Sequence, residues 1–467
     1  MKSVALHNLG CKVNAYEMDV MRQNLQENGY EIVSFAQKAD VYIVNTCTVT
    51  NIADRKSRQM LHRARRNNPA AVIVAVGCYV QHEAESQSAA DDAPSLQAEA
   101  LGADIIIGNN RKNQIVRILD EYFKSHAVQD NLIDIARTDE YERLFLKKPQ
   151  EHTRAFLKIQ DGCNQFCTYC AIPYARGRVR SREPGEVLSE ARVLADAGCR
   201  EIVLTGIHLS SYGLDFPGVR SADYRDAVKA GFLAELIGRL AEIPELARIR
   251  LGSLEPQIVT KEFAERLAGC EKLCPHFHLS LQSGSDTVLK RMNRRYTTEE
   301  FEGGVRILRE AFDRVAITTD VIVGFPGETE EEFAATKAFA ERVGFYEMHV
   351  FPYSKRAGTP AARMKDQISE HIKAERSKEL IAIGEKLSGR YRAGLIGQRM
   401  EILTEEVKDI GGMRVLVGHT KDYVPAAVPE HASETNRIVC GVGERLLTEG
   451  GQQLVLMREP HDESFIA

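Results

Sequence analysis

Short apolar runs alternate with amphipathic stretches along about the first 145 residues. Four runs have the length of a β-strand: Val4–Leu6, Val41–Val44, Val72–Val76 and Ile105–Ile107. Between them lie stretches with helical spacing, such as Tyr16–Asn28, which Gly29 ends, and Ala53–Asn67, which Pro69 ends. This alternation predicts a parallel sheet with helical crossovers.

A second series of strand and helix patterns follows. Its six candidate strands are Phe156–Ile159, Glu201–Thr205, Arg248–Leu251, Phe277–Leu281, Ala316–Val323 and Glu347–Phe351. Helical patterns such as Pro184–Ala197 and Thr329–Val343 separate them. Six βα units predict an incomplete β/α barrel whose site lies at the C-terminal strand ends. The segments Glu83–Ala98 and Asp215–Lys229 are interpreted as loops.

The C-terminal pattern is different. After a charged helical connector, Ser369–Arg392, short alternating runs punctuated by glycine predict a small antiparallel barrel: Met400–Thr404, Met413–Gly418, Arg437–Val442 and Gln452–Met457. With 467 residues the chain is too long for one core. We therefore expect an α/β protein with three domains, at residues 1–145, 146–386 and 390–460.

The composition is that of a globular protein outside the membrane, with 43% hydrophobic and 27% charged residues. The longest apolar run, Ala70–Val80, is too short to span a bilayer. The N-terminus has no secretory pattern. We therefore expect a cytoplasmic, reducing location, where cysteines serve as metal ligands or free thiols.

Six of the ten cysteines form two groups of three. The close trio, Cys163, Cys167 and Cys170, has the spacing C-x3-C-x2-C and follows the first strand of the second series. Thiolates at this spacing can surround an iron–sulfur cluster, and three of them on a four-iron cube leave one iron free. A zinc knuckle or inert thiols are the alternatives, but structural zinc prefers four ligands and no fourth is apparent nearby.

The scattered trio, Cys11, Cys47 and Cys78, follows three strands of the predicted parallel sheet. Because the C-terminal ends of such strands share one edge, these cysteines are expected to meet and to hold a second cluster. A lone cysteine at a strand end is more often a small buried apolar residue. The remaining cysteines are interpreted as structural: Cys199, Cys270, Cys274 and Cys440.

Five further residues are candidates for binding a cofactor: Tyr169, Gly206, Glu255, Gln282 and Gly324. Tyr169 lies between two cysteines of the close trio, so we expect it to pack against the cofactor. The other four follow predicted strands, where glycine permits close backbone approach and polar groups orient a ligand. Ordinary turn chemistry is the alternative for these four.

Basic residues form three groups although the net charge is -5. The groups are Arg55, Lys56, Arg58, Arg63, Arg65 and Arg66; Arg176, Arg178, Arg180 and Arg182; and Lys290, Arg291, Arg294 and Arg295. Such groups bind phosphates, whereas any single one is more often a solvated surface. Three of them in an acidic chain favour RNA as a partner.

Several phrases resemble the radical-SAM (S-adenosylmethionine) methylthiotransferase family over almost the whole chain: Asn8–Asn14, Asn45–Thr50, Gly162–Gly177 and Ser280–Gly284. The order of the scattered trio, the close trio and a small barrel is also that of the family. The run Gly10–Asn14 followed by Tyr16 and Glu17 is most similar to the branch that acts on N6-threonylcarbamoyladenosine in tRNA.

The resemblance implies a role for each trio. The close trio would hold the four-iron cluster that binds and cleaves SAM, and the resulting 5′-deoxyadenosyl radical would take a hydrogen from C2 of adenine. The scattered trio would hold a second four-iron cluster that carries the sulfur for insertion. A second SAM would supply the methyl group.

The family architecture implies a central (β/α)6 barrel of the radical-SAM type and a C-terminal OB-like barrel of the RNA-binding TRAM type. His419, Lys421 and Tyr423 lie on a plausible RNA-binding loop of that barrel, although the tyrosine could belong to its core. The expected partners are a tRNA anticodon loop, an electron donor and a sulfur source, with no membrane.

The expected activity is a tRNA methylthiotransferase that converts N6-threonylcarbamoyladenosine at position 37, beside the anticodon, into its 2-methylthio derivative. The same chemistry on isopentenyladenosine in tRNA, or on an aspartate of a ribosomal protein, is the nearest alternative. An alternative of another class is a non-catalytic RNA-binding protein with structural zinc.

Overall fold

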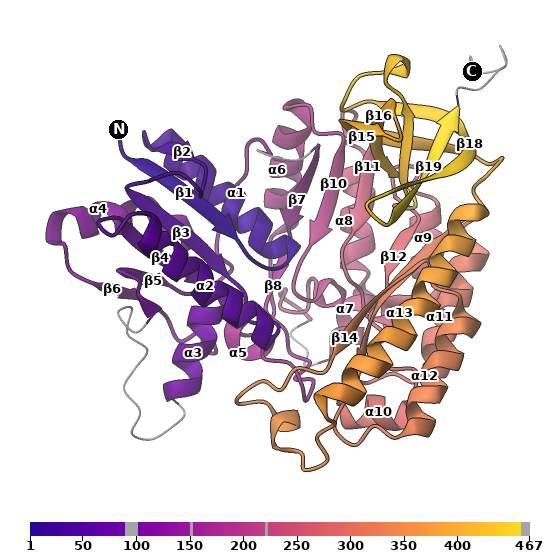
Figure 1. The fold of residues 1–467 in the computed structure, drawn as a ribbon, viewed down its shortest axis with the longest axis horizontal. Coiled ribbons are helices and arrows are strands. Elements are labelled where there is room, and N and C mark those ends of the chain that lie inside the picture. Colours follow the sequence, from indigo (N-terminus) through magenta and orange to yellow (C-terminus); the bar gives the residue numbers. More distant parts are fainter. Residues whose placement is uncertain (89–100, 150–152, 220–222, 459–467) are drawn as a thin grey trace.

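Six parallel strands form the N-terminal sheet in the order β2-β1-β3-β4-β5-β6 (Figure 1). They are β1 (Ser3–Asn8), β2 (Glu31–Val33), β3 (Val41–Thr46), β4 (Val72–Gly77), β5 (Ile105–Ile107) and β6 (Gln129–Asn131). This computed structural model describes residues 1–88, 101–149, 153–219 and 223–458. The predicted parallel sheet is confirmed. The edge strands β2 and β6 are too short to produce a sequence signal.

Helices cover both faces of this sheet because β3 and β4 are buried on both sides. Helices α1 (Lys12–Glu27) and α4 (Ile115–Ser125) pack on one face, and α2 (Asn51–Asn67) and α3 (Cys78–Ser88) pack on the other. The loop prediction for Glu83–Ala98 was wrong in its first part, since α3 continues to Ser88; its remainder lies outside the described residues.

The central barrel contains six parallel strands, as predicted: β7 (Arg154–Lys158), β10 (Glu201–Thr205), β11 (Arg248–Leu251), β12 (His276–His278), β13 (Ala316–Val323) and β14 (Glu347–Pro352). Hydrogen bonding runs in the order β11-β10-β7 and β12-β13-β14, and isolated bridges such as Leu254 to Leu279 join the two sheets. The barrel is therefore open between β7 and β14.

Helices follow the strands of the central barrel and cover its outside (Figure 1). They are α6 (Pro184–Asp196), α7 (Tyr224–Ala230), α8 (Phe232–Ala241), α9 (Lys261–Ala268), α10 (Asp286–Arg291), α11 (Thr298–Ala311), α12 (Glu330–Val343) and α13 (Glu370–Ala393). Thr297 and Thr329 begin α11 and α12 with complete capping boxes. The loop prediction for Asp215–Lys229 was wrong from Tyr224 on, because α7 occupies that part.

Near the close trio are three short elements: the paired strands β8 (Gln160–Asp161) and β9 (Arg180–Ser181), and α5 (Ile172–Arg176).

The C-terminal barrel is closed in the order β15-β16-β17-β19-β18. Its strands are β15 (Arg399–Ile410), β16 (Met413–Thr420), β17 (Pro425–Pro429), β18 (Ile438–Glu449) and β19 (Gln452–Arg458). The pairing is antiparallel except between β17 and β19, which are parallel. The sequence pattern predicted a wholly antiparallel barrel, because strand alternation does not reveal the direction of the closing pair.

Helix α1 belongs to two cores. Met18, Met21 and Leu25 pack against the N-terminal sheet, whereas Tyr16 and Val20 join the core of the central barrel. The N-terminal sheet and the central barrel are therefore joined by a packed interface at α1.

None of the helices in the described ranges has both the length and the apolar character needed to cross a bilayer.

Candidate active site

The scattered trio gathers at one edge of the N-terminal sheet. Strands β1, β3 and β4 are neighbours, and a cysteine follows each of them: Cys11 at the start of α1, Cys47 directly after β3, and Cys78 as the first residue of α3. The thiols of Cys11 and Cys78 are close enough to Cys47 to raise its pKa. The predicted meeting of the three cysteines is therefore present in the structure.

Gly10 and Asn14 hold the strand-end loops of the scattered trio together. Gly10 has φ +113°, and a Cβ on it would stand 3.1 Å from the Sγ of Cys47. The Asn14 side-chain amide donates to the carbonyl of Leu9 at 2.7 Å and to that of Thr46 at 3.0 Å. The loops that carry Cys11 and Cys47 are thus fixed against each other.

The close trio lies in the loop after β8, at the C-terminal end of the central barrel. The backbone NH of Cys163 donates to the carbonyl of Gly177 at 3.0 Å, and the NH of Cys170 donates to the carbonyl of Cys167 at 3.0 Å. Gly162 is required just before the trio, because a Cβ there would stand 1.8 Å from the carbonyl oxygen of Arg178. The loop is therefore tightly folded around its three thiols.

The thiols of Cys47, Cys163 and Cys170 resist ionisation while they carry no metal. Burial, followed by repulsion from neighbouring thiols, raises the pKa of Cys47 and of Cys170 to about 12. The same causes raise the pKa of Cys163 well above its usual value. Such thiols lose their protons when a metal takes the place of the proton, so both sites have the chemistry of metal ligands.

In neither trio are the three sulfur atoms close enough together to bind one metal ion. Two sulfurs bound at ~2.3 Å to one zinc ion lie at most ~4.6 Å apart. Among the described residues, the one group of three His, Cys, Asp or Glu ligand atoms within 4.8 Å of one another is His278, Asp320 and His349. Three thiols that are near neighbours yet more widely spaced fit the corners of a four-iron cube better than a zinc ion.

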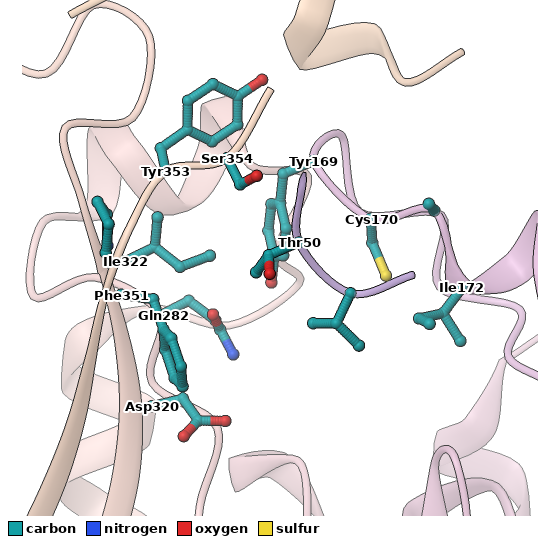
Figure 2. A pocket seen from close by; sticks show the side chains of 13 residues that line it. Thr50, Tyr169, Cys170, Ile172, Gln282, Asp320, Ile322, Phe351, Tyr353 and Ser354 are labelled. Atoms are coloured by element: carbon teal, nitrogen blue, oxygen red, sulfur yellow. The ribbon is translucent and has the colours of Figure 1, made fainter. Parts of the chain in front are cut away.

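One cavity lies beside the close trio and also borders the loop that follows Cys47 (Figure 2). It spans about 750 Å³, including the solvent space at its open mouth. Cys170 and Tyr169 line one side, and Val49 and Thr50, from the loop just after Cys47, line another. The remaining lining residues come from the central barrel and include Gln282, Asp320, Ile322, Phe351, Tyr353 and Ser354.

The structure separates the predicted cofactor-binding residues into two sets. Tyr169 and Gln282 line the cavity, but Gly206, Glu255 and Gly324 are not among its lining residues. A Cβ on Gly206 would stand 2.8 Å from Gln160, and one on Gly324 would stand 2.4 Å from Lys373. These two glycines are explained by close packing of their own neighbours.

Glu255 is paired with an arginine that the sequence analysis assigned to a phosphate-binding group. Arg294 donates to both carboxylate oxygens of Glu255 at 2.7 Å and to the Sγ of Cys167 at 3.3 Å. Burial opposes ionisation of Glu255, yet the charge of Arg294 keeps its pKa below the usual value. Arg294 was expected to bind phosphate, and no sequence signal indicated that it lies beside the close trio.

Arg176 makes the corresponding contact at the scattered trio, and the sequence did not indicate this either. Its guanidinium is fully buried and donates to the Sγ of Cys78 at 3.1 Å, to Asn14 at 2.5 Å and to Glu17 at 2.6 Å. Glu17 also accepts from Lys112 at 2.7 Å and from Lys158 at 2.8 Å. A buried ion network therefore links the N-terminal sheet to the central barrel.

The prediction of three phosphate-binding groups needs correction. Arg176, Arg180 and Arg182 are buried and face the carboxylates of Asp161 and Glu190.

In the third group, Arg294 binds Glu255 and Arg291 binds Glu332 at 2.6 Å, which leaves Lys290 and Arg295 exposed. The group on α2 stays at the surface: Arg65 pairs with Asp104, but Arg55, Lys56, Arg58, Arg63 and Arg66 are exposed.

The predicted RNA-binding loop of the C-terminal barrel faces inward. The Tyr423 ring stacks on His419, with centroids 4.7 Å apart, and lies 5.0 Å from the ring of His276 and 4.6 Å from the Arg250 guanidinium. Lys421 donates to a backbone carbonyl of the central barrel at 2.9 Å. These contacts dock the C-terminal barrel onto the central barrel, and contact of the same residues with RNA stays a prediction.

Comparison with known proteins gives matches over most of the chain. Residues 157–340 match the radical SAM superfamily, and residues 3–97 match the uncharacterized protein family UPF0004. The threonylcarbamoyladenosine tRNA methylthiotransferase MtaB of Bacillus subtilis (strain 168) is 44% identical over 91% of this chain and 90% of its own length. The protein of the same name from Aquifex aeolicus (strain VF5) is 39% identical over 87% of this chain and 96% of its own length.

The chain is also similar to a relative that is named for a different substrate, dimethylallyladenosine. The tRNA-2-methylthio-N(6)-dimethylallyladenosine synthase of Pelotomaculum thermopropionicum is 34% identical over 88% of each protein. Among solved structures, the radical S-adenosylmethionine methyltransferase TsrM from Kitasatospora setae, with cobalamin and a [4Fe-4S] cluster bound, superposes with a TM-score of 0.50. It is 17% identical, and the match covers 77% of each chain, so the likeness is one of fold.

Proposed function

This chain belongs to the radical-SAM methylthiotransferase family, and we propose that it converts N6-threonylcarbamoyladenosine in the anticodon loop of tRNA into the 2-methylthio derivative. As a member of this family it uses SAM and [4Fe-4S] clusters. The substrate is supported by the names of two relatives, at 44% and 39% identity, against 34% for the relative named for dimethylallyladenosine.

The single observation that carries this proposal is the cavity that Cys170 of the close trio and the loop after Cys47 line together. The close trio would hold the cluster that binds SAM, and the scattered trio would hold the cluster that donates sulfur. When bound, these groups supply a 5′-deoxyadenosyl radical, a sulfur atom and a methyl group. A base in this cavity would lie between Cys170 on one side and the loop of Cys47 on the other.

Residues of the chain orient the reactants and exclude water. The Gln282 amide and the Asp320 carboxylate point into the cavity and offer hydrogen bonds (Figure 2). Ile322 and Phe351 provide apolar walls that limit access of water. Arg294 and Arg176 each donate a hydrogen bond to one sulfur of a trio, Cys167 and Cys78 respectively, and place a positive charge beside it.

Because a base must leave its stack to enter such a cavity, a loop adenosine is a suitable target. An electron donor and a sulfur source complete the proposed set of partners.

Substitution of one cysteine in each trio tests the proposed division of roles. The wild-type protein is expected to be brown after anaerobic reconstitution, with about eight irons per chain. Cys163→Ser should abolish SAM cleavage and methylthiolation together. Cys47→Ser should retain SAM cleavage and lose methylthiolation. Cys440→Ser, an exposed cysteine of the C-terminal barrel, is the control and should retain both.

The readouts are iron content, 5′-deoxyadenosine by chromatography, and 2-methylthio nucleosides by mass spectrometry of tRNA. Equal loss of both activities in the two trio variants would contradict the division of roles. A colourless protein that contains zinc and does not cleave SAM would contradict the proposed function. Preferred conversion of isopentenyladenosine would support the methylthiotransferase reaction but would show that threonylcarbamoyladenosine is not the substrate.

A further inference from the structure

Two histidines and an aspartate lie side by side on three neighbouring strands of the central barrel. The register pairs Asp320 of β13 with His349 of β14, and it pairs Thr318 of β13 with His278 of β12. Because side chains alternate along a strand, Asp320 projects to the same face as Thr318. This face is the one toward the cavity, because Asp320 lines the cavity (Figure 2). Three strands therefore present two imidazoles and one carboxylate to the same space.

The ligand atoms of this group have the spacing of metal ligands. Nδ1 of His349 lies 3.1 Å from one carboxylate oxygen of Asp320, and Nε2 of His278 lies 3.4 Å from the other. One nitrogen or oxygen atom of each residue lies within 4.8 Å of those of the other two. Two such atoms, each bound at ~2.1 Å to one ion, lie ~3.4 Å apart when the bond angles are tetrahedral. The group therefore has nearly the size of a coordination sphere.

The ring of His278 is held in the orientation that a metal ligand needs. Its Nδ1 lies 3.1 Å from the hydroxyl oxygen of Thr318, and the residue is only 9% exposed. Its Nε2 is buried and faces Asp320, yet among the described residues it has no hydrogen-bond partner. In metal-binding histidines a partner on one ring nitrogen fixes the ring, and the other nitrogen binds the ion. A buried ring nitrogen without a partner is costly, and a bound ion removes that cost.

We propose that His278, Asp320 and His349 bind one divalent metal ion of the Mn²⁺, Fe²⁺ or Zn²⁺ class. Imidazole and carboxylate ligands suit these ions, whereas the two trios offer only thiolates. Three protein ligands leave coordination positions open, and Asp320 directs them toward the cavity, where they take an oxygen ligand. The side chain of His349 is 50% exposed, which gives the ion a path of entry. The inference goes beyond the proposed function and does not depend on which nucleoside is the substrate.

Titration of the protein with Mn²⁺ tests this proposal, because Mn²⁺ favours harder ligands than thiolates. The protein carries its reconstituted clusters and is first passed over a chelating resin. The electron paramagnetic resonance signal of free Mn²⁺ should be lost until a single ion per chain is bound. Electron–nuclear double resonance of the bound ion should then show coupling to imidazole nitrogen.

Two variants and a matched control assign the ligands. His349→Ala and His278→Gln should each weaken Mn²⁺ binding by at least ~10-fold, since loss of a partner outside the coordination sphere already costs that much. His349 is exposed, so its variant should keep the wild-type melting temperature. His371→Ala is the control and should keep the wild-type affinity. Nε2 of His371 lies 3.4 Å from Glu375, but within the described ranges this pair belongs to no group of three ligands.

The alternative is a row of hydrogen bonds, with Asp320 between two histidines. If the wild-type protein binds no Mn²⁺ with nitrogen coupling, or if both histidine variants bind it as tightly as the wild type, this alternative holds and the inference is overturned. Neither result affects the proposed function, which is read from SAM cleavage and from the nucleosides of tRNA.

Discussion

Arg176 shows how one buried side chain connects the two halves of the site. It follows the close trio in the sequence, yet it donates to Cys78 of the scattered trio. Its charge is balanced by Glu17 and Asp161, both of which are buried. Hydrogen bonds and positive charge at a cysteine sulfur raise the reduction potential of an iron–sulfur cluster. Arg176 would therefore tune the cluster proposed at the scattered trio from the other side of the interface.

Arg176→Gln should lower the reduction potential of that cluster, because a positive charge next to a ligand sulfur is removed. It should also destabilise the fold by about 3–5 kcal/mol, since it breaks a buried ion network. The potential is measured by a redox titration followed by electron paramagnetic resonance, in a variant whose close trio is replaced by serine. Stability is measured by thermal denaturation.

Arg178→Gln removes an exposed arginine two residues away and is the control. An unchanged potential in Arg176→Gln would show that the hydrogen bond to Cys78 has no electronic effect.

At the scale of elements, α2 combines a structural face with a charged face. Asp54, Ser57, Leu61 and Ala64 are buried against the rest of the molecule, while five cations point outward. The N-terminal end of α2 lies at the cavity, because Thr50, which lines the cavity, caps the helix. A helix in this position can hold the phosphates of an RNA whose base enters the cavity.

Replacing Arg55, Arg63 and Arg66 together with glutamine should weaken tRNA binding without changing the cleavage of SAM alone. The slope of the logarithm of the RNA association constant against the logarithm of the salt concentration should become shallower. The change should be about 0.7–0.9 for each phosphate that the protein no longer neutralises. Filter binding at several salt concentrations measures this slope.

A variant with the same change of charge on α13 provides the control. It replaces Lys378, Lys386 and Arg390 with glutamine; these residues are exposed, and α13 lies on the right of Figure 1 whereas α2 lies on the left. Equal weakening by both variants would mean that the effect is one of net charge and not of α2.

At the scale of the whole molecule, the C-terminal barrel is docked by the turn between β16 and β17. Arg250 donates to the carbonyls of Lys421 at 2.8 Å and Thr420 at 3.3 Å, and Arg248 donates to that of His419 at 2.9 Å. Tyr423 adopts φ +65°, an unusual conformation for a residue with a side chain, and its ring fills the space among these groups. The turn therefore closes the N-terminal strand ends of the central barrel.

Tyr423→Ala should loosen this docking, at a cost of about 2–4 kcal/mol, because the packing and the cation–π interactions of the ring are removed. Limited proteolysis should then cut faster in the connection between α13 and β15, and the melting temperature should fall. His431→Ala, at an exposed residue of the same barrel, should change neither. If Tyr423→Ala instead weakened RNA binding with no change in proteolysis or melting temperature, the loop would be an RNA-binding element and not a docking element.

The sequence alone determined the backbone layout and the grouping of the cysteines. The close trio is contiguous, so its spacing brings the thiols together in any fold of that loop. The scattered trio could be predicted because parallel strands end at one edge, and Cys11, Cys47 and Cys78 each follow such a strand. Local periodicity and chain connectivity carry this information.

The tertiary structure alone decided which charges are buried and what they face. Arg176 and Arg294 are indistinguishable in the sequence from the exposed cations of α2. Their partners or surroundings are remote: Arg176 meets Cys78 across 98 positions, and Arg294 meets Cys167 across 127. A charge at a given position has the same sequence pattern whether water or a buried carboxylate surrounds it, and only the packing of distant elements determines which of the two it meets.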